Sequence, residues 1–165
     1  MCIRDSWYAG CWQKHAGRAA GKSLGLRFPR HRLAHSAPGK PHLGRYLHRH
    51  GHHALRQLES QSIADLNVQQ TVIATGGSAI YGETAMRHLA LMGHIVYLRC
   101  PLSVLDQRIS DMNARGIAAP PGQGLNEVEA ERVPLYEQYA DATLDVGTQS
   151  MEDALDQLLT LIKAR

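Results

Sequence analysis

The chain has 165 residues, a length typical of one domain that buries its own hydrophobic core. It contains no apolar run long enough to cross a bilayer and no signal-peptide core, which argues against a membrane protein. Its three cysteines, Cys2, Cys11 and Cys100, show neither a metal-ligand spacing nor a disulfide framework, as expected in a reducing cytoplasm. We therefore expect a single cytoplasmic domain over residues 1–165 with no membrane contact.

The charge is divided unevenly along the chain. Residues 1–56 hold 11 of the 18 Lys and Arg but only one of the 15 acidic residues, Asp5. A basic arm of this kind is typical of proteins that contact nucleic acid or another acidic surface. Nucleic acid is nevertheless not the partner we expect, because the basic composition has another explanation that is given below.

Residues 1–47 lack the hydrophobic periodicity of a folded segment. The stretch from Met1 to Cys11 has no apolar run of the kind expected in a first buried strand. Seven of the ten histidines lie between His31 and His53, but no carboxylate or cysteine pattern accompanies them, so no metal site is expected. We expect residues 1–47 to be atypical, either disordered or mistranslated, with a degraded first strand.

Gly21-Lys22-Ser23 matches the second half of the phosphate-binding pattern G-x-x-x-x-G-K-[ST]. The first glycine of that pattern would stand at Ala16, and no predicted strand precedes it. Lys22 and Ser23 are therefore candidates for ATP binding on a partial match alone.

The pattern becomes regular from His48 onward. Apolar residues from Ala54 to Leu66 form one face of a predicted helix. The β-branched, apolar run from Thr71 to Thr75 predicts a strand buried on both faces, and Gly76 and Gly77 end it.

The remaining elements alternate between helix and strand. We predict a helix over 83–92, a strand over 95–98 and a helix that begins at Pro101. Residues 113–124 have the Pro and Gly content of a mobile loop.

The last third of the chain predicts three more elements. A helix capped by Asn126 is expected to run to Tyr139, kinked or interrupted at Pro134. A short strand over 144–146 and an amphipathic helix over 150–163 follow. Strands that alternate with helices predict an α/β fold with a parallel, doubly wound sheet.

The paired glycines that end the strand at 71–75 are a candidate ligand site. A main chain without Cβ atoms allows a ligand to approach closely, and ligands of open α/β sheets bind beyond the carboxyl ends of the strands. Gly76, Gly77 and Ser78 lie at that position. A tight strand-to-helix turn with no ligand is the alternative interpretation.

Several segments, in this order and spacing, resemble the shikimate kinase family. They are ALRQLE at 54–59, ATGG at 74–77, VYL at 96–98, an Arg-Gly loop at 115–116, ERVPLY at 131–136 and YAD at 139–141. The resemblance covers about residues 48–165, and the glycine turn and the ERVPLY segment are its most specific parts. It implies a P-loop kinase-like fold, a three-layer sandwich with a central parallel sheet, whose intact core is residues 48–165.

The resemblance also implies an activity and its partners. Shikimate kinases transfer the γ-phosphoryl group of ATP to the 3-hydroxyl of shikimate with Mg²⁺, in chorismate and aromatic amino acid biosynthesis. By the same resemblance Arg56 and Arg132 hold the substrate carboxylate, because guanidinium groups match a carboxylate with two parallel hydrogen bonds. Glu59 holds Arg56 in place. We expect a monomer that binds shikimate and ATP.

Two further roles follow from the resemblance. The main chain of Gly76, Gly77 and Ser78 approaches the ring hydroxyls of the substrate. Arg115 matches the lid arginine that closes on the nucleotide phosphates and neutralises charge during transfer. An ordinary exposed loop arginine is the alternative interpretation of Arg115.

The sequence departs from the family pattern at three places. Ser78 stands where the family usually has a third glycine, and the lid continues after Arg115 with Gly116-Ile117 rather than Pro-Leu. The Asp-x-Asp motif that orients the attacking hydroxyl is missing, and its slot reads Arg30-His31-Arg32.

A shift of reading frame would explain the missing motifs. Trp has the single codon TGG, so reading Trp12 to Gly17 one base later gives glycine and permits Lys-Ser-Thr-Leu, a phosphate loop whose lysine falls at the slot of Lys14. The same shift over 30–32 permits Asp-Thr-Asp. We hypothesise that residues from about Cys11 to the upper forties are translated in a shifted frame, so that the activity of this chain is in doubt.

Two alternatives to shikimate phosphorylation stay open at this point. One keeps the fold and changes the acceptor to another small hydroxylated acid, because the lid departs from the family pattern. The other is a non-catalytic binding protein with a basic N-terminal arm, whose nucleic-acid binding would depend strongly on salt.

Overall fold

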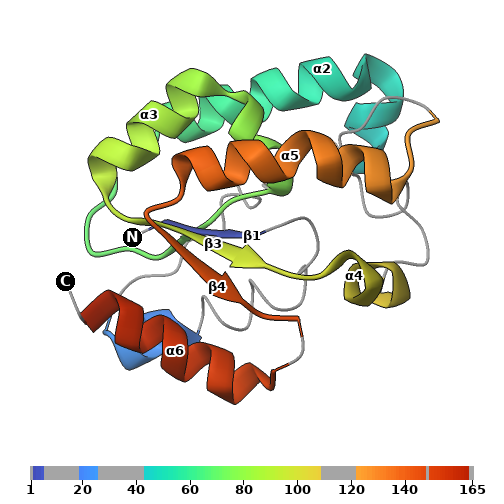
Figure 1. Cartoon of the computed structure of the whole chain (residues 1–165). Coiled ribbons are helices and arrows are strands. Elements are labelled where there is room, and N and C mark those ends of the chain that lie inside the picture. Colours follow the sequence, from blue (N-terminus) through green and yellow to red (C-terminus); the bar gives the residue numbers. More distant parts are fainter. Residues whose placement is uncertain (1, 6–18, 26–42, 109–121, 148, 164–165) are drawn as a thin grey trace.

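The structure is a computed structural model, and it describes residues 2–5, 19–25, 43–108, 122–147 and 149–163 (Figure 1). These residues form a parallel sheet with helices on both of its faces. The predicted three-layer α/β sandwich is therefore confirmed.

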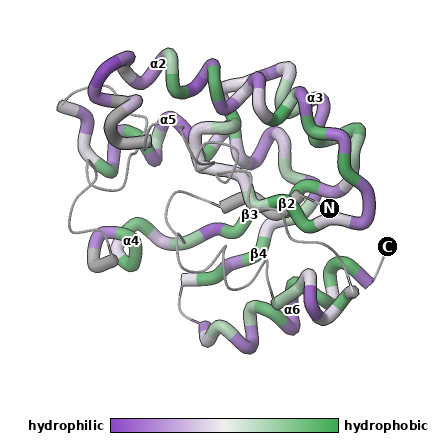
Figure 2. The backbone as a smooth tube through the Cα atoms, turned by 180° about the vertical axis from the view of Figure 1, so that it is seen from behind, coloured by the Kyte–Doolittle hydropathy of each residue, from purple (hydrophilic) through white to green (hydrophobic). Residues whose placement is uncertain are grey.

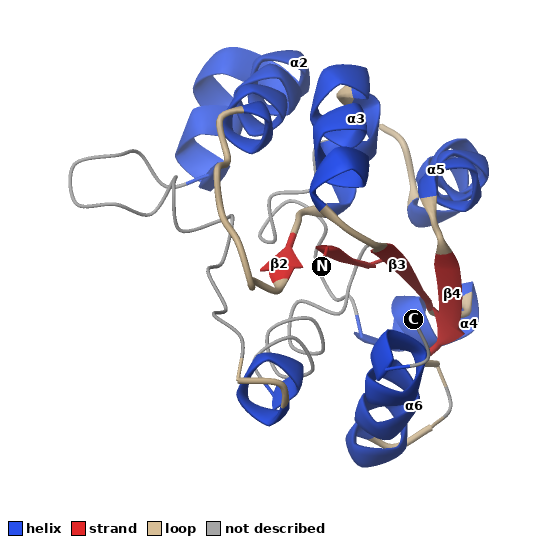
Figure 3. Cartoon of the chain, turned by 90° about the vertical axis from the view of Figure 1, so that its left-hand side faces the viewer, coloured by secondary structure: helices blue, strands red, loops and turns tan. Residues whose placement is uncertain are grey.

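The four described strands run parallel to one another. They are β1 (Cys2–Asp5), β2 (Ile73–Ala74), β3 (Ile95–Arg99) and β4 (Ala142–Asp145). Their order across the sheet is β2-β1-β3-β4, which Figure 3 shows edge to edge. The carboxyl ends of all four strands consequently lie along one edge of the sheet.

The position of β1 corrects one sequence-based expectation. Met1 to Cys11 lacks an apolar run, yet Cys2–Asp5 forms a strand between two neighbours, with Cys2 opposite both Ile73 and Ile95. A strand that is paired on both sides is held by main-chain hydrogen bonds along both of its edges, which side-chain periodicity over four residues cannot reveal.

Helices cover both faces of the sheet (Figure 1, Figure 3). On one face lie α2 (Leu43–Ala64), α3 (Glu83–Met92) and α5 (Leu125–Tyr139), and α6 (Met151–Lys163) lies on the other. The helical residues 19–23 lie beside α6, and α4 (Leu102–Arg108) follows β3. None of the helices in the described part of the chain is long and apolar enough to span a membrane.

Strand β3 divides the core into two layers, because successive side chains of a strand point to opposite faces. Val96 and Leu98 pack in a cluster that includes Ala154 and Leu158 of α6. Ile95 packs on the other face, with Met86 and Leu89 of α3 among its neighbours. Apolar and polar residues are interspersed along α6 (Figure 2), and its buried residues Ala154 and Leu158, four positions apart, lie on one side of the helix.

The observed ends of the helices agree with the predictions for α3 and α6. Ser150 caps α6, since its hydroxyl oxygen accepts the main-chain N–H of Asp153 at 3.1 Å. The predicted start of α5 is wrong: the helix begins at Leu125, with Gly124 as its N-cap, and not behind Asn126. Pro134 lies inside α5 without dividing it.

Helix α2 is longer than predicted because it continues across Gly51. That glycine has φ 77° and ψ 173°, a conformation that other residues rarely adopt, and it joins two helical stretches at a kink. After the kink the buried residues Leu55, Glu59 and Ile63 repeat every four positions, so one stripe of the helix faces the rest of the molecule.

Two leucines of α3 differ in burial and therefore test how this helix packs. Leu89 is 0% exposed and Leu91 is 88% exposed. We expect Leu89→Ala to lower the free energy of unfolding by about 2–5 kcal/mol, because it leaves a cavity in the core. The matched control, Leu91→Ala, should change it by no more than about 0.5 kcal/mol. Urea unfolding followed by circular dichroism measures both, and equal effects would contradict this packing.

Candidate active site

The chain turns at the carboxyl end of β2 into a short 3₁₀ helix, η2 (Gly77–Tyr81). The residue before it, Gly76, is extended, and a Cβ atom at this position would lie 2.9 Å from Glu59 Oε1. A Cβ atom there would have to displace this carboxylate, so the glycine allows Glu59 of α2 to hold its position beside the turn.

Glu59 and Ser78 form a buried polar pair at this turn. Glu59 is 2% exposed and Ser78 is 7% exposed, and the Ser78 hydroxyl donates a hydrogen bond to Glu59 Oε2. A buried carboxylate needs such donors, because its desolvation otherwise disfavours the charged form. The serine that replaces the family's third glycine therefore supplies a hydrogen bond that glycine could not.

Two guanidinium groups meet over one tyrosine ring. Arg56 of α2 lies with its guanidinium carbon 3.5 Å from the centroid of the Tyr81 ring. Arg132 of α5 lies 5.2 Å from the same centroid, and its Nε donates to the Tyr81 hydroxyl at 3.0 Å. The structure thus brings together two arginines that are far apart in the sequence and that come from separate helices.

A second tyrosine joins α5 to the glycine turn. The Tyr136 hydroxyl donates to the main-chain oxygen of Gly77 at 2.9 Å. Its ring stacks on Tyr97 of β3, with centroids 5.0 Å apart and planes inclined by 17°. Because Tyr136 follows Arg132 by four positions, both side chains lie on the same face of α5. One helix face therefore fixes both the turn and one arginine.

Burial and positive charge dominate the electrostatics of the site formed by Arg56, Arg132 and Tyr81. Burial lowers the pKa of the Arg56 guanidinium, Tyr81 raises it, and the nearby charge of Arg132 lowers it again. Glu59 also raises this pKa, as the last of the contributions. Burial raises the pKa of Tyr81, and the charge of Arg132 lowers it. Two cations in one partly buried site lower the free energy of a bound anion.

A histidine lies next to this positive region. Burial, His53 and Arg56 each lower the pKa of His52, while the carboxylate of Glu131 raises it. His52 and His53 lie with ring centroids 4.1 Å apart. The neutral form of His52 is consequently favoured beside the guanidinium group.

The sequence-predicted nucleotide residues do not join this site in the described part of the chain. Lys22 and Ser23 are exposed and lie in the helical segment 19–23, where the N–H of Leu24 bonds to the oxygen of Ala20 at 3.0 Å. The role of Lys22 and Ser23 in ATP binding stays a prediction. Lys14 and Arg115 lie outside the described residues.

The described residues offer no ready metal site. Across 2–5, 19–25, 43–108, 122–147 and 149–163, no group of three or more His, Cys, Asp or Glu side chains could hold a metal ion.

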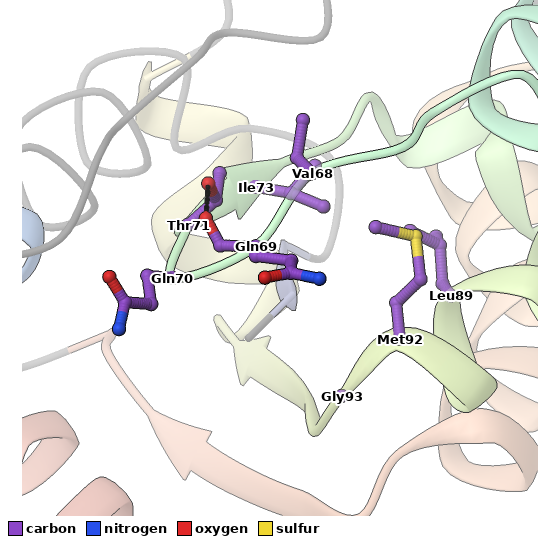
Figure 4. Close-up of a pocket in the computed structure, with 8 residues that line it drawn as sticks. All are labelled: Val68, Gln69, Gln70, Thr71, Ile73, Leu89, Met92 and Gly93. Atoms are coloured by element: carbon purple, nitrogen blue, oxygen red, sulfur yellow. Dashed lines mark hydrogen bonds between the residues drawn. The ribbon is translucent and has the colours of Figure 1, made fainter.

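A cavity of about 190 Å³ lies elsewhere in the molecule (Figure 4). Its lining comes from the segment before β2 and from the end of α3: Val68, Gln69, Gln70, Thr71, Ile73, Leu89, Met92 and Gly93. These residues lie at the amino ends of β2 and β3. Because ligands of parallel sheets bind at the carboxyl ends, this cavity is separate from the arginine site.

Sequence reasoning missed the two tyrosines. Tyr136 was part of the ERVPLY segment, and its spacing of four from Arg132 was an available signal. Tyr81 carried no signal of its own, because its role depends on a 3₁₀ turn that places it between α2 and α5.

Comparisons with known proteins identify the family. The shikimate kinase family model matches residues 16–163. Shikimate kinase 2 of Yersinia enterocolitica is 27% identical over 158 residues, which cover 93% of this chain and 90% of the relative. The shikimate kinase of Methylococcus capsulatus is 33% identical over 112 residues, which cover 66% of this chain and 63% of the relative.

Solved structures agree with this assignment at the level of the fold. A shikimate kinase from Acinetobacter baumannii in complex with shikimate has a TM-score of 0.85 at 23% identity, and the match covers 99% of this chain and 93% of that one. The shikimate kinase of Aquifex aeolicus has a TM-score of 0.79 at 22% identity, with 99% and 97% covered. Since the family model spans most of its length, this chain belongs to the shikimate kinase family of ATP-dependent phosphotransferases.

Proposed function

We propose that the corner formed by α2, η2 and α5 binds shikimate through its carboxylate. The observation that carries the proposal is the convergence of Arg56 and Arg132 on the Tyr81 ring. Guanidinium groups bind carboxylates through short, charge-assisted hydrogen bonds, and a desolvated site strengthens them. A neutral sugar would leave both charges in the site without a counter-ion. The site therefore favours a small organic acid.

The other proposed contacts surround this anchor. The main chain of Gly76, Gly77 and Ser78 would face the ring hydroxyls, and the Ser78–Glu59 pair would hold the turn in place. Arg115 would close on the nucleotide phosphates. Shikimate kinases use ATP and Mg²⁺, and we expect this chain to use both.

We further propose that residues 1–165 form one domain with its intact core at 48–165, and that its reading frame is shifted from about Cys11 to the upper forties. Strand β1 ends at Asp5, ahead of the proposed shift, so its pairing in the sheet is compatible with it. The family match from residue 16 runs through the shifted stretch and weighs against the hypothesis. The nucleotide sequence decides the question.

A cytoplasmic location and a monomeric state remain predictions.

The first test concerns the arginine anchor. Arg56→Lys keeps the charge and removes the planar fork, so we expect shikimate affinity to fall roughly tenfold to a hundredfold. The matched control is Arg87→Lys on α3, because Arg87 is exposed and pairs only locally with Glu83 at 2.6 Å. It should leave the affinity unchanged. Isothermal titration calorimetry measures both dissociation constants, and equal affinities for the two variants would refute the anchor.

The second test separates binding from turnover. We expect this chain to bind shikimate but to release little or no ADP in a coupled assay with ATP and Mg²⁺, because neither a phosphate loop nor Asp-x-Asp is present in the translated sequence. A variant gene with compensating one-base changes at the two borders should restore turnover. Ordinary turnover by the unchanged chain would contradict the frame hypothesis.

A further inference from the structure

We propose that Tyr81 is a positioning residue that orients Arg56 and Arg132 and thereby gives the site its preference for a carboxylate. This inference deepens the proposed function and rests on it. Nothing in the family resemblance pointed to Tyr81, and its role follows from the contacts of its ring and its hydroxyl.

The backbone places Tyr81 between the two arginine helices. It is the last residue of η2, whose turn is closed by the N–H of Gly82 on the oxygen of Ala79 at 3.1 Å. The start of the same turn is fixed to α5 by the Tyr136 hydroxyl on the oxygen of Gly77. Tyr81 is therefore anchored through its main chain, and its half-buried side chain has a defined place.

The ring and the hydroxyl act on different arginines. The guanidinium carbon of Arg56 lies 3.5 Å from the ring centroid, a stacking distance at which the electron-rich ring face attracts the cation. A guanidinium group that stacks through its face keeps its N–H edge, the part that recognises a carboxylate, clear of the ring. Tyr81 thus orients Arg56 without covering the edge that a substrate needs.

Arg132 is oriented by the hydroxyl. Its Nε donates to the Tyr81 oxygen at 3.0 Å, and a bond at Nε fixes the rotation of the whole planar group. Arg132 is 2% exposed, so protein groups and not bulk water orient its guanidinium group. One side chain therefore contacts two like charges and helps to offset their mutual repulsion.

This arrangement predicts selectivity as well as affinity. A carboxylate gains from two aligned guanidinium groups, whereas an uncharged analogue gains little from them. Tyr81 should consequently contribute to the binding of shikimate and very little to the binding of its methyl ester, which has the same ring and hydroxyls without the charge. A residue that only supported the fold would affect both ligands equally.

The test compares Tyr81→Phe, which removes the hydroxyl, and Tyr81→Leu, which also removes the aromatic face. Calorimetry with shikimate and with methyl shikimate gives the affinities, and thermal unfolding confirms that each variant is folded. We expect Tyr81→Phe to weaken shikimate binding about tenfold, Tyr81→Leu to weaken it further, and both to leave the ester nearly unchanged. The matched control is Tyr139→Phe. Tyr139 lies two turns beyond Arg132 on α5 and packs against the core cluster that includes Met86 and Leu89 of α3.

The outcomes separate this inference from the function on which it rests. Unchanged shikimate affinity in Tyr81→Phe, tighter binding, or an equal loss for acid and ester each overturns the positioning role. Tighter binding would mean that the hydroxyl occupies the place of the substrate carboxylate. If the unchanged chain binds no shikimate, the proposed function fails, and this inference fails with it.

Discussion

Two positively charged groups held together in a partly buried corner are the constraint on which the site depends. Arg56 and Arg132 approach the same ring from different helices, and burial already disfavours the charge on Arg56. Such an arrangement is stable only if other groups offset the repulsion and the lost hydration. The ring and hydroxyl of Tyr81 and the buried carboxylate of Glu59 supply part of that compensation. A bound carboxylate would add to that compensation.

The glycine turn makes this arrangement possible by letting three elements meet. At Gly76 the missing side chain leaves room for Glu59 of α2, and at Gly77 the main-chain oxygen accepts the Tyr136 hydroxyl of α5. Ser78 then binds the carboxylate that reaches the turn. The turn is therefore a structural junction that joins β2 to α2 and α5. Ligand binding at the same turn stays a prediction.

Some parts of the fold and the site could be predicted because they depend on local pattern. The strand at 95–98, the helix at 83–92 and the closing helix show regular apolar spacing and clear end signals, and they were found with the correct type and nearly correct ends. The start of α5 was predicted wrongly because Asn126 has the side chain of a cap, while Gly124 caps the helix through its extended main chain alone. The aspartate of the YAD segment has a structural role that no pattern revealed: the Asp141 carboxylate accepts the N–H of Ile95 at 2.7 Å, at the start of β3.

The amino-acid sequence by itself determined the family, the alternation of strands and helices, and the identity of the arginines, the glutamate and the glycines at the site. These features depend on residue types and spacings along one dimension. Only the tertiary structure decided that Cys2–Asp5 lies inside the sheet and that Lys22 lies in a helix. It also placed Tyr81 between two guanidinium groups. The physical reason is that strand pairing between residues such as Cys2 and Ile95, and the approach of Arg56 and Arg132 to one ring, join distant parts of the chain and leave no local periodicity in the sequence.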